Sequence, residues 1–362
     1  MLNQRCNMDF KEQLFNLFNH QIVGGSVVLI KNGMFFQYNY GCRSLINNRP
    51  VEDDTIFRIA SISKVIIGMT VMKLTEDGLL DLDEDIGNYL GFRVRNPKYP
   101  DVPITTRMLL MHTSSITNGL DNESVEIGYN GVNGKKFFVA LEDLLLNTQS
   151  GYYTEKTYSP FCPGEKYIYS NFGFGIIACI IEKVTNTLFT DFVEQKILKP
   201  LKLDASFKAD RIRKQDKISD TFLGFTTNRT ANSFIEATYP DFPLGNNFRG
   251  PAGGLFISMP DLSKIMVALF NDGKYRDVQL LKKETVDYYL SMNFLPSRTY
   301  PDKGVLLQGH TGNAYGVTSL MYFCKAKKTG ICFIANGGNY RPMPSGMNQI
   351  QEGIIDLLLQ AL

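Results

Sequence analysis

The stretch Phe57-Arg58-Ile59-Ala60-Ser61-Ile62-Ser63-Lys64, which leads into the apolar run 65–74, decides the fold of the chain. Apolar side chains at positions 62, 65, 66, 69 and 72 have the spacing of one buried helix face. We therefore expect a buried helix that begins at Ser61 and ends near residues 77–78.

Ser61 and Lys64 are three residues apart, so on a helix they share one face with Cβ atoms about 5–6 Å apart. The helix start adds unpaired N–H groups and partial positive charge. A hydroxyl, an amine that can take its proton and N–H donors are what acyl transfer needs. Ser-x-x-Lys also occurs by chance, and Ser is an ordinary N-cap residue, so the motif needs its context.

Composition limits the classes of function. The chain has 362 residues, 44% hydrophobic and 20% charged, which is typical of a globular protein with about two subdomains. A net charge of +2 with scattered Lys and Arg gives no support to a nucleic-acid partner. Only three histidines and no C-x-x-C spacing disfavour metal ligation, and no cofactor is implied. Because the number of cysteines is even, one disulfide bond is not excluded. The cysteines are Cys6, Cys42, Cys162, Cys179, Cys324 and Cys332.

The chain carries no targeting signal that we recognise. Residues 1–10 lack the apolar core of a signal peptide, which leaves open a cytoplasmic protein or the mature or trimmed form of an exported one. The longest apolar run, near residues 175–181, is far short of the about 20 residues of a membrane-spanning helix.

The first half predicts a hairpin, helices and a long loop. Asn32-Gly33 lies between two β-rich runs and predicts a tight hairpin turn. Residues 9–20 predict an amphipathic helix, and the acidic run 81–85 reads as a turn because it lacks the Gly and Glu of a calcium loop. Residues 104–115 predict a short capped helix with His112 at its end, in a structural role. Residues 116–160 predict a loop region with a short helix near 137–146.

Tyr169 and Asn171 alternate with Ser170 just before a predicted helix at 171–186, so both side chains can point into one cleft. A buried Tyr with a satisfied hydroxyl and an Asn N-cap is the plainer interpretation. The glycine-rich run 250–258 approaches a strand and matches neither a P-loop nor a dinucleotide-binding turn. Helices are predicted at 260–270 and 280–290, strands at 317–323 and 330–337, and a helix at 350–362.

Three motifs stand in a fixed order: Ser61-Ile62-Ser63-Lys64, Tyr169-Ser170-Asn171 and His310-Thr311-Gly312. This order resembles the serine β-lactamase and penicillin-binding protein superfamily, with its S-x-x-K, Y-x-N and K-T-G motifs. The sequence segments around these motifs are similar to those of class C β-lactamases, D-alanyl-D-alanine carboxypeptidases and esterases. The similarity covers nearly the whole chain from about residue 22.

The resemblance implies an α/β (α+β) fold of the β-lactamase/transpeptidase type, an antiparallel sheet flanked by helices with an inserted, mainly helical domain. On this basis we expect a sheet domain at 1–80 and 205–362 and an inserted domain at 81–204. The resemblance places the active site at their interface.

The resemblance also implies roles. Ser61 is the expected nucleophile and Lys64 takes or relays its proton. Tyr169 is the second candidate base and the later proton donor, although a phenol with a pKa near 10 needs nearby cations to act as a base. Asn171 holds Lys64 or the substrate amide.

The third motif would border the substrate. The backbone N–H groups of Ser61 and Asn313 form the expected oxyanion hole, and Gly312 permits close backbone approach. His310 replaces the usual Lys and, with a pKa near 6.5, supplies less fixed positive charge to a substrate carboxylate. We therefore expect activity or specificity to change as His310 titrates. The reduced positive charge also makes an efficient β-lactamase a less favoured interpretation.

The sequence favours a serine hydrolase that forms an acyl-enzyme with an amide or ester, of the D,D-peptidase, carboxypeptidase or esterase kind. A class C-type β-lactamase is the alternative within the same class. A non-catalytic β-lactam sensor or scaffold with a vestigial site is the alternative of another class. The expected partner is a small-molecule or peptide substrate, with a covalent β-lactam adduct as one outcome.

Overall fold

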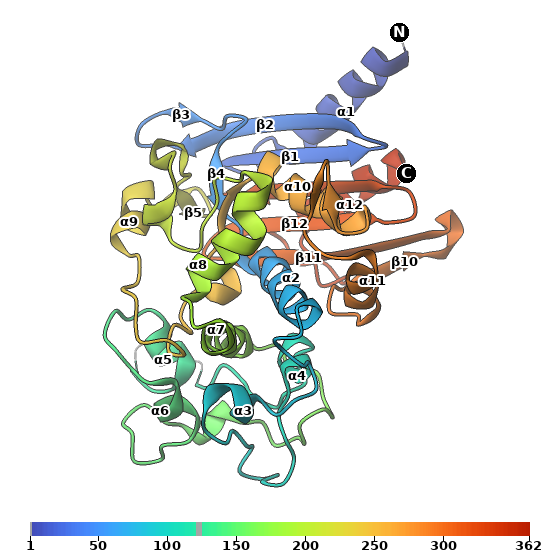
Figure 1. The fold of residues 1–362 in the computed structure, drawn as a ribbon. Coiled ribbons are helices and arrows are strands. Elements are labelled where there is room, and N and C mark those ends of the chain that lie inside the picture. Colours follow the sequence, from blue (N-terminus) through green and yellow to red (C-terminus); the bar gives the residue numbers. More distant parts are fainter. Residues whose placement is uncertain (1, 121–124) are drawn as a thin grey trace. The chain divides into compact units, whose positions relative to one another are not determined.

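The computed structural model describes residues 2–120 and 125–362, with side chains from residue 9 onward (Figure 1). The side chains of residues 1–8, that of Cys6 among them, therefore lie outside the described part. The chain divides into two compact units. The first comprises Met1–Val65, Leu198–Thr238 and Gly253–Leu362, and the second comprises Ile66–Ile197 and Tyr239–Ala252.

A seven-stranded antiparallel sheet is the centre of the first unit, with the strand order β10-β11-β12-β13-β1-β2-β3. The predicted hairpin is confirmed: Asn32 and Gly33 form its turn, both with positive φ. The strands are β1 (Gly24–Lys31), β2 (Met34–Ser44), β3 (Arg49–Pro50), β10 (Ser297–Tyr300), β11 (Val305–Ala314), β12 (Val317–Cys324) and β13 (Thr329–Ala335).

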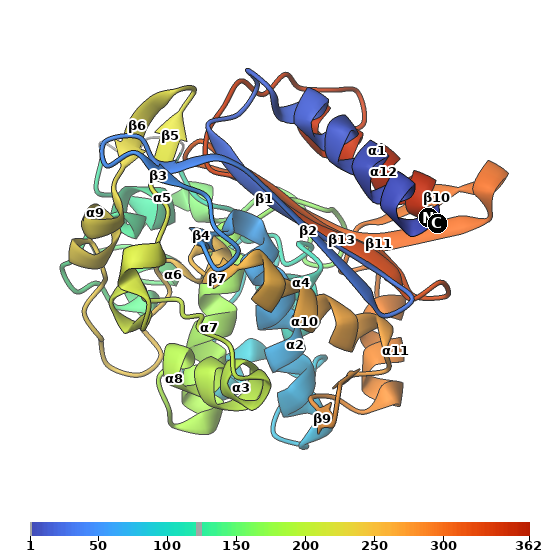
Figure 2. The same cartoon turned by 90° about the horizontal axis from the view of Figure 1, so that it is seen from above.

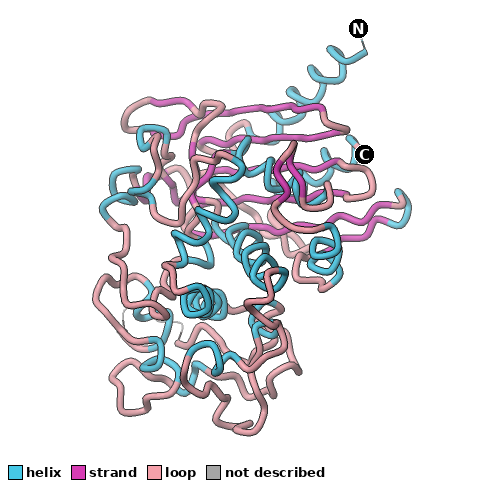
Figure 3. The backbone as a smooth tube through the Cα atoms, viewed as in Figure 1, coloured by secondary structure: helices cyan, strands magenta, loops and turns pink. Residues whose placement is uncertain are grey.

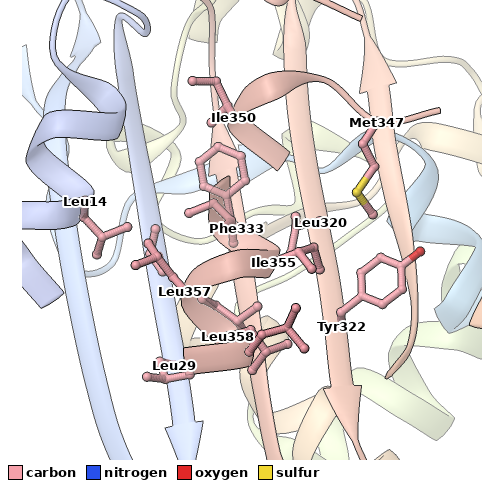
Figure 4. Close-up of a cluster of buried hydrophobic side chains, with 14 of the residues drawn as sticks. Leu14, Leu29, Leu320, Tyr322, Phe333, Met347, Ile350, Ile355, Leu357 and Leu358 are labelled. Atoms are coloured by element: carbon pink, nitrogen blue, oxygen red, sulfur yellow. The ribbon is translucent and has the colours of Figure 1, made fainter. Parts of the chain in front are cut away.

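Helices cover both faces of this sheet (Figure 2). On one face α1 (Leu2–Phe18) and α12 (Gln349–Ala361) lie side by side, and α10 (Met259–Phe270) lies on the other. Alternate residues of β13 serve the two faces. Phe333 packs with Leu357 and Leu358 of α12 (Figure 4), whereas the sulfur of Cys332 lies 3.7 Å from that of Met266 in α10.

Smaller elements complete the first unit. β4 (Ile56–Arg58) pairs with β7 (Phe256–Ser258), so the segment before Ser61 is held by the end of the glycine-rich run. A second small cluster packs Phe234 of α9 (Ala231–Glu236) against Phe256. The remaining elements are β5 (Thr221–Leu223), β6 (Thr226–Arg229), β8 (Lys274–Tyr275), β9 (Val278–Gln279) and α11 (Lys283–Ser291).

The second unit consists, in its described part, of helices and loops (Figure 3). Its longest helix, α7 (Asn171–Thr185), is buried from Phe172 to Glu182, and α2 (Ser63–Glu76) enters the unit from the first. The predicted helix near 137–146 is present, and a further helix, α5, was not predicted. The others are α3 (Ile86–Leu90), α4 (Thr106–Leu110), α5 (Gly128–Asn133), α6 (Leu141–Leu145) and α8 (Phe189–Val193).

The sheet class and its antiparallel topology agree with the expectation from sequence. The expected limits of the two domains stay a prediction, because a compact unit is not thereby shown to fold alone. Among the described residues no single helix is long and apolar enough to cross a membrane. Residues 171–185 and 189–201 meet that length and composition only as a pair bent by 78°.

Candidate active site

Ser61 lies in a 3₁₀ turn, Ala60–Ile62, and α2 begins two residues later at Ser63. The prediction that the helix begins at Ser61 was therefore wrong, because the α-helix begins two residues later. The physical reason is the backbone conformation of Ala60, whose φ of +50° makes the chain bend sharply just ahead of the helix. Ser61 remains partly exposed, which a reacting hydroxyl requires.

The buried side chain of Ser63 holds this turn. Its hydroxyl donates to the carbonyl of Ala60 at 2.7 Å and accepts the Leu255 N–H at 3.1 Å. Arg58 Nε donates to the Gly253 carbonyl at 3.0 Å, and Ile59 N–H donates to the Leu255 carbonyl. The glycine-rich run thus fixes the backbone on which Ser61 stands, a role that the sequence did not reveal.

Lys64 is the group next to the Ser61 hydroxyl, with Nζ to Oγ at 3.1 Å. Its side chain is fully buried, and burial lowers the pKa of its ammonium to about 7, because a charged amine loses hydration there. A large fraction of Lys64 is therefore neutral near pH 7 and can accept a proton from Ser61.

β11 approaches the same turn from the sheet. A Cβ on Gly312 would lie 2.8 Å from the Ile59 carbonyl oxygen and 2.4 Å from Ser319 Oγ, so only glycine fits without rearrangement. Ser319 Oγ also donates to the Ile59 carbonyl at 2.9 Å. The expected close approach at Gly312 is thus present, and it is between β11 and the turn that bears Ser61.

The hairpin of β11 and β12 determines where the Asn313 N–H points. Its two-residue turn, Tyr315-Gly316, has positive φ at both positions, so Ala314 and Val317 are the hydrogen-bonded pair beside the turn. Hydrogen-bonded pairs alternate along an antiparallel ladder. The backbone N–H of Asn313 therefore points away from β12, toward an edge that β10 covers only along residues 305–308.

The side chain of Asn313 is anchored from α12. Its Oδ1 accepts from Thr318 Oγ1 at 2.7 Å and from Gln351 Nε2 at 3.3 Å. Asn348, the N-cap of α12, donates from Nδ2 to Thr318 Oγ1 at 2.7 Å and forms a capping box with Gln351. Sequence reasoning missed this polar network, although Asn348-x-x-Gln351 has the spacing of a capping box.

His310 is buried, and its Nδ1 donates to the Thr311 carbonyl. Burial, with a smaller contribution from the charge of Lys64, lowers the pKa of His310 to about 4. The expectation of a titration near pH 6.5 is therefore wrong: the imidazole stays neutral between pH 5 and 8. The reason is tertiary, since a sequence cannot show that this strand position is out of water.

Tyr169 and Asn171 lie in the second unit, at the start of α7. Ser170, and not Asn171, is the N-cap, with its hydroxyl accepting the Gly173 N–H at 3.0 Å. Asn118 Oδ1 accepts the N–H groups of Asn171 and Phe172 at 2.7 and 3.1 Å. The side chain of Asn171 therefore does not cap the helix, as a substrate-binding role requires. Tyr169 is 37% exposed.

The candidate residues therefore fall into two groups. In the first unit the structure brings together Ser61, Lys64 and the strand that carries His310, Thr311, Gly312 and Asn313. Tyr169 and Asn171 form the second group, on one short segment of the second unit.

A protein-family model described as Beta-lactamase matches residues 8–350. Penicillin-binding protein 4* of Bacillus subtilis (strain 168) is 24% identical over 323 residues, 83% of this chain and 65% of the relative. Protein flp of Staphylococcus aureus (strain N315) is 24% identical over 344 residues, 92% of this chain and 64% of the relative. The chain thus spans somewhat less than two thirds of these curated relatives.

Solved structures share the fold. D-amino acid amidase from Ochrobactrum anthropi SV3, complexed with D-phenylalanine, has a TM-score of 0.71 at 21% identity and 98% coverage of both chains. A class C beta-lactamase has a TM-score of 0.67 at 16% identity, with 98% of this chain and 96% of that chain covered. At these identities the likeness concerns the fold alone.

Proposed function

The chain belongs to the beta-lactamase family, and from that premise we propose that it is a serine hydrolase in which Ser61 forms an acyl-enzyme with an amide or ester. One observation carries the proposal: a buried Lys64 amine, with a pKa of about 7, lies 3.1 Å from the Ser61 hydroxyl. A primary amine in water has a pKa near 10.4 and would hold its proton at neutral pH.

In the proposed acylation step Ser61 Oγ attacks the substrate carbonyl carbon and its proton passes to Lys64 Nζ. The oxyanion binds the N–H groups of Ser61 and Asn313, the second of which points to the open edge of β11. The oxyanion then re-forms the carbonyl, and the bond from the carbonyl carbon to the leaving nitrogen or oxygen breaks, so that an amine or alcohol leaves with the proton from Lys64 Nζ. Attack by water on the acyl-enzyme then breaks the ester bond to Ser61 Oγ, releases the carboxylic acid and returns the Ser61 hydroxyl.

We propose that the second unit supplies Tyr169 as an additional proton carrier and Asn171 as a donor to the substrate amide. Three things support this: the Y-x-N spacing, the exposed Tyr169 ring, and the Asn171 side chain that capping leaves available. Both residues act by direct contact with the reacting groups in this mechanism.

The proposed substrate is an amide or ester of a D-amino acid, of the peptidase, amidase or esterase kind. Support comes from the amidase fold relative and from the neutral His310, which provides no cation for a substrate carboxylate. A β-lactamase is the second candidate, which the family match favours.

The test is intact-mass spectrometry after reaction with a fluorophosphonate and, separately, a fluorescent penicillin. We expect one fluorophosphonate adduct per chain, with loss of fluoride, in wild type and in Ser345→Ala, an exposed-serine control. Ser61→Ala should give no adduct. A penicillin adduct that persists indicates a peptidase-like enzyme or a β-lactam sensor, and one that clears with release of hydrolysed penicillin indicates a β-lactamase. Equal labelling of Ser61→Ala and wild type would refute the proposal.

A further inference from the structure

His112 occupies a backbone position that favours glycine. It follows α4 with φ +57°, and the end of this helix is a Schellman motif: Thr113 N–H bonds the Met108 carbonyl and His112 N–H bonds the Leu109 carbonyl. A non-glycine residue here costs about 1 kcal/mol relative to glycine. A histidine is thus less favourable than glycine at this position. This indicates that the His112 side chain has a role that outweighs the backbone strain.

The ring of His112 supports the segment that carries Tyr169. Its Nδ1 accepts the Ser170 N–H at 3.0 Å, and its own carbonyl accepts the Ile168 N–H at 2.7 Å. The imidazole also lies against the Tyr169 ring, with centroids 4.4 Å apart and planes 33° apart. One buried residue therefore holds the backbone on both sides of Tyr169 and one face of its ring.

Two further rings pack against the imidazole. Phe174 of α7 lies 5.3 Å from it between ring centroids, and Tyr167 meets it edge-on at 5.5 Å. Because Nδ1 accepts an N–H, it carries no proton in this arrangement, so the ring cannot rotate without losing that hydrogen bond. The imidazole is fixed in orientation, and Tyr169 is fixed by it.

We propose that His112 is a positioning residue that fixes Tyr169 for proton transfer. The inference rests on the proposed function, in which Tyr169 contacts the reacting groups. A tyrosine that is 37% exposed samples several orientations unless something holds it, and each misplacement weakens proton transfer. His112 does not itself touch the substrate.

Two substitutions separate positioning from a structural role. His112→Gly relieves the positive φ but removes the ring and its acceptor. His112→Asn tolerates the same φ and places an oxygen where Nδ1 stands, so it keeps an acceptor for the Ser170 N–H. We expect His112→Gly to lower kcat for hydrolysis of a D-amino acid amide at least tenfold with little change in KM. Tm should also fall, because removal of a buried ring leaves a cavity. His112→Asn should recover most of that loss.

The matched control is Asn186→Gly, which removes another non-glycine residue with positive φ, at the far end of α7. It should leave kcat unchanged. In a Tyr169→Phe background, His112→Gly should cost nothing further, because the group that it positions is gone. Full additivity of the two substitutions, or wild-type kcat in His112→Gly, would overturn the inference. Failure of Ser61 labelling in wild type would instead remove the proposed function itself.

Discussion

Lys64 is the residue whose protonation should set the pH dependence of this protein. Its pKa is lowered to about 7 by burial, so the neutral amine forms as pH rises through 7. We predict that the rate of Ser61 acylation rises between pH 6 and 8 and then levels off, as read from fluorophosphonate labelling at a series of pH values. Lys64→Arg, which stays charged, should lower the rate about 10²–10⁴-fold.

His310 is the control for that profile. The imidazole has a pKa of about 4, so it is already neutral where Lys64 titrates. His310→Gln should therefore keep the rise between pH 6 and 8, whatever its effect on the plateau. Loss of the rise in His310→Gln, with Lys64 intact, would show that the histidine and not the lysine carries the titration.

Arg249 of the second unit is a buried cation whose Nη1 and Nη2 have no hydrogen-bond partner among the residues that the structure describes. Its guanidinium lies over the rings of Phe242 and Phe248, with 5.1 and 4.6 Å to their centroids, and Nε donates to the Val132 carbonyl. We predict that Arg249→Met changes the free energy of unfolding by less than about 1 kcal/mol, because an apolar chain of similar volume needs no desolvation. Arg249→Ala should cost about 2–4 kcal/mol, since it leaves a cavity. Urea unfolding measures both, and equal losses would contradict the argument.

At the level of elements, the N-terminus of α12 should control how well β11 presents the Asn313 N–H. Asn348→Ala removes the cap of α12 and the donor to Thr318, so we predict a loss of about 1–2 kcal/mol of stability. Acylation should also slow about tenfold, because the Asn313 anchor loosens. Ser258→Ala removes the cap of α10 on the opposite face of the sheet. It should cost similar stability and leave acylation unchanged; if both variants slow equally, α12 has no special link to β11.

Elements that depend on neighbouring residues could be predicted from the sequence. The turn at Asn32-Gly33 needs two residues that tolerate positive φ, and that dipeptide supplies them. The start of α2 could not be predicted, because Ser63 and Leu255 are far apart in the chain and together hold the turn before it. The same is true of Asn118, whose Oδ1 accepts two N–H groups in the first turn of α7 although it is far away in the chain.

The candidate site divides in the same way. The three motifs and their order identified Ser61, Lys64 and Tyr169 as candidates from sequence alone. The pKa values of Lys64 and His310 could not be predicted, because burial decides them and burial is a property of the folded chain. The sequence placed His112 at the end of a helix in a structural role, but its contact with the Ser170 N–H could not be predicted, because that contact carries no sequence signature.

At the scale of the whole molecule, the path of the chain ties each unit to segments far away in sequence. The second unit is built from residues 66–197 and the separate segment 239–252. Glu182, fully buried in α7, accepts the N–H groups of Phe189 and Gly245 and the side-chain amide of Asn247. Gly245 and Asn247 belong to the separate segment, so the first part alone would leave a buried carboxylate without these donors.

We predict that a fragment of residues 66–197 alone keeps helical far-UV circular dichroism but lacks near-UV signal and binds a hydrophobic dye. Joining residues 239–252 through a flexible linker should restore a single cooperative unfolding transition, because Gly245 and Asn247 again donate to Glu182 and Phe248 again packs against Gly175. A linker that carries the same residues in scrambled order is the control. Cooperative unfolding of the fragment without this segment would show that the contacts of Glu182 are dispensable, and that the unit is defined by α7 and its neighbours alone.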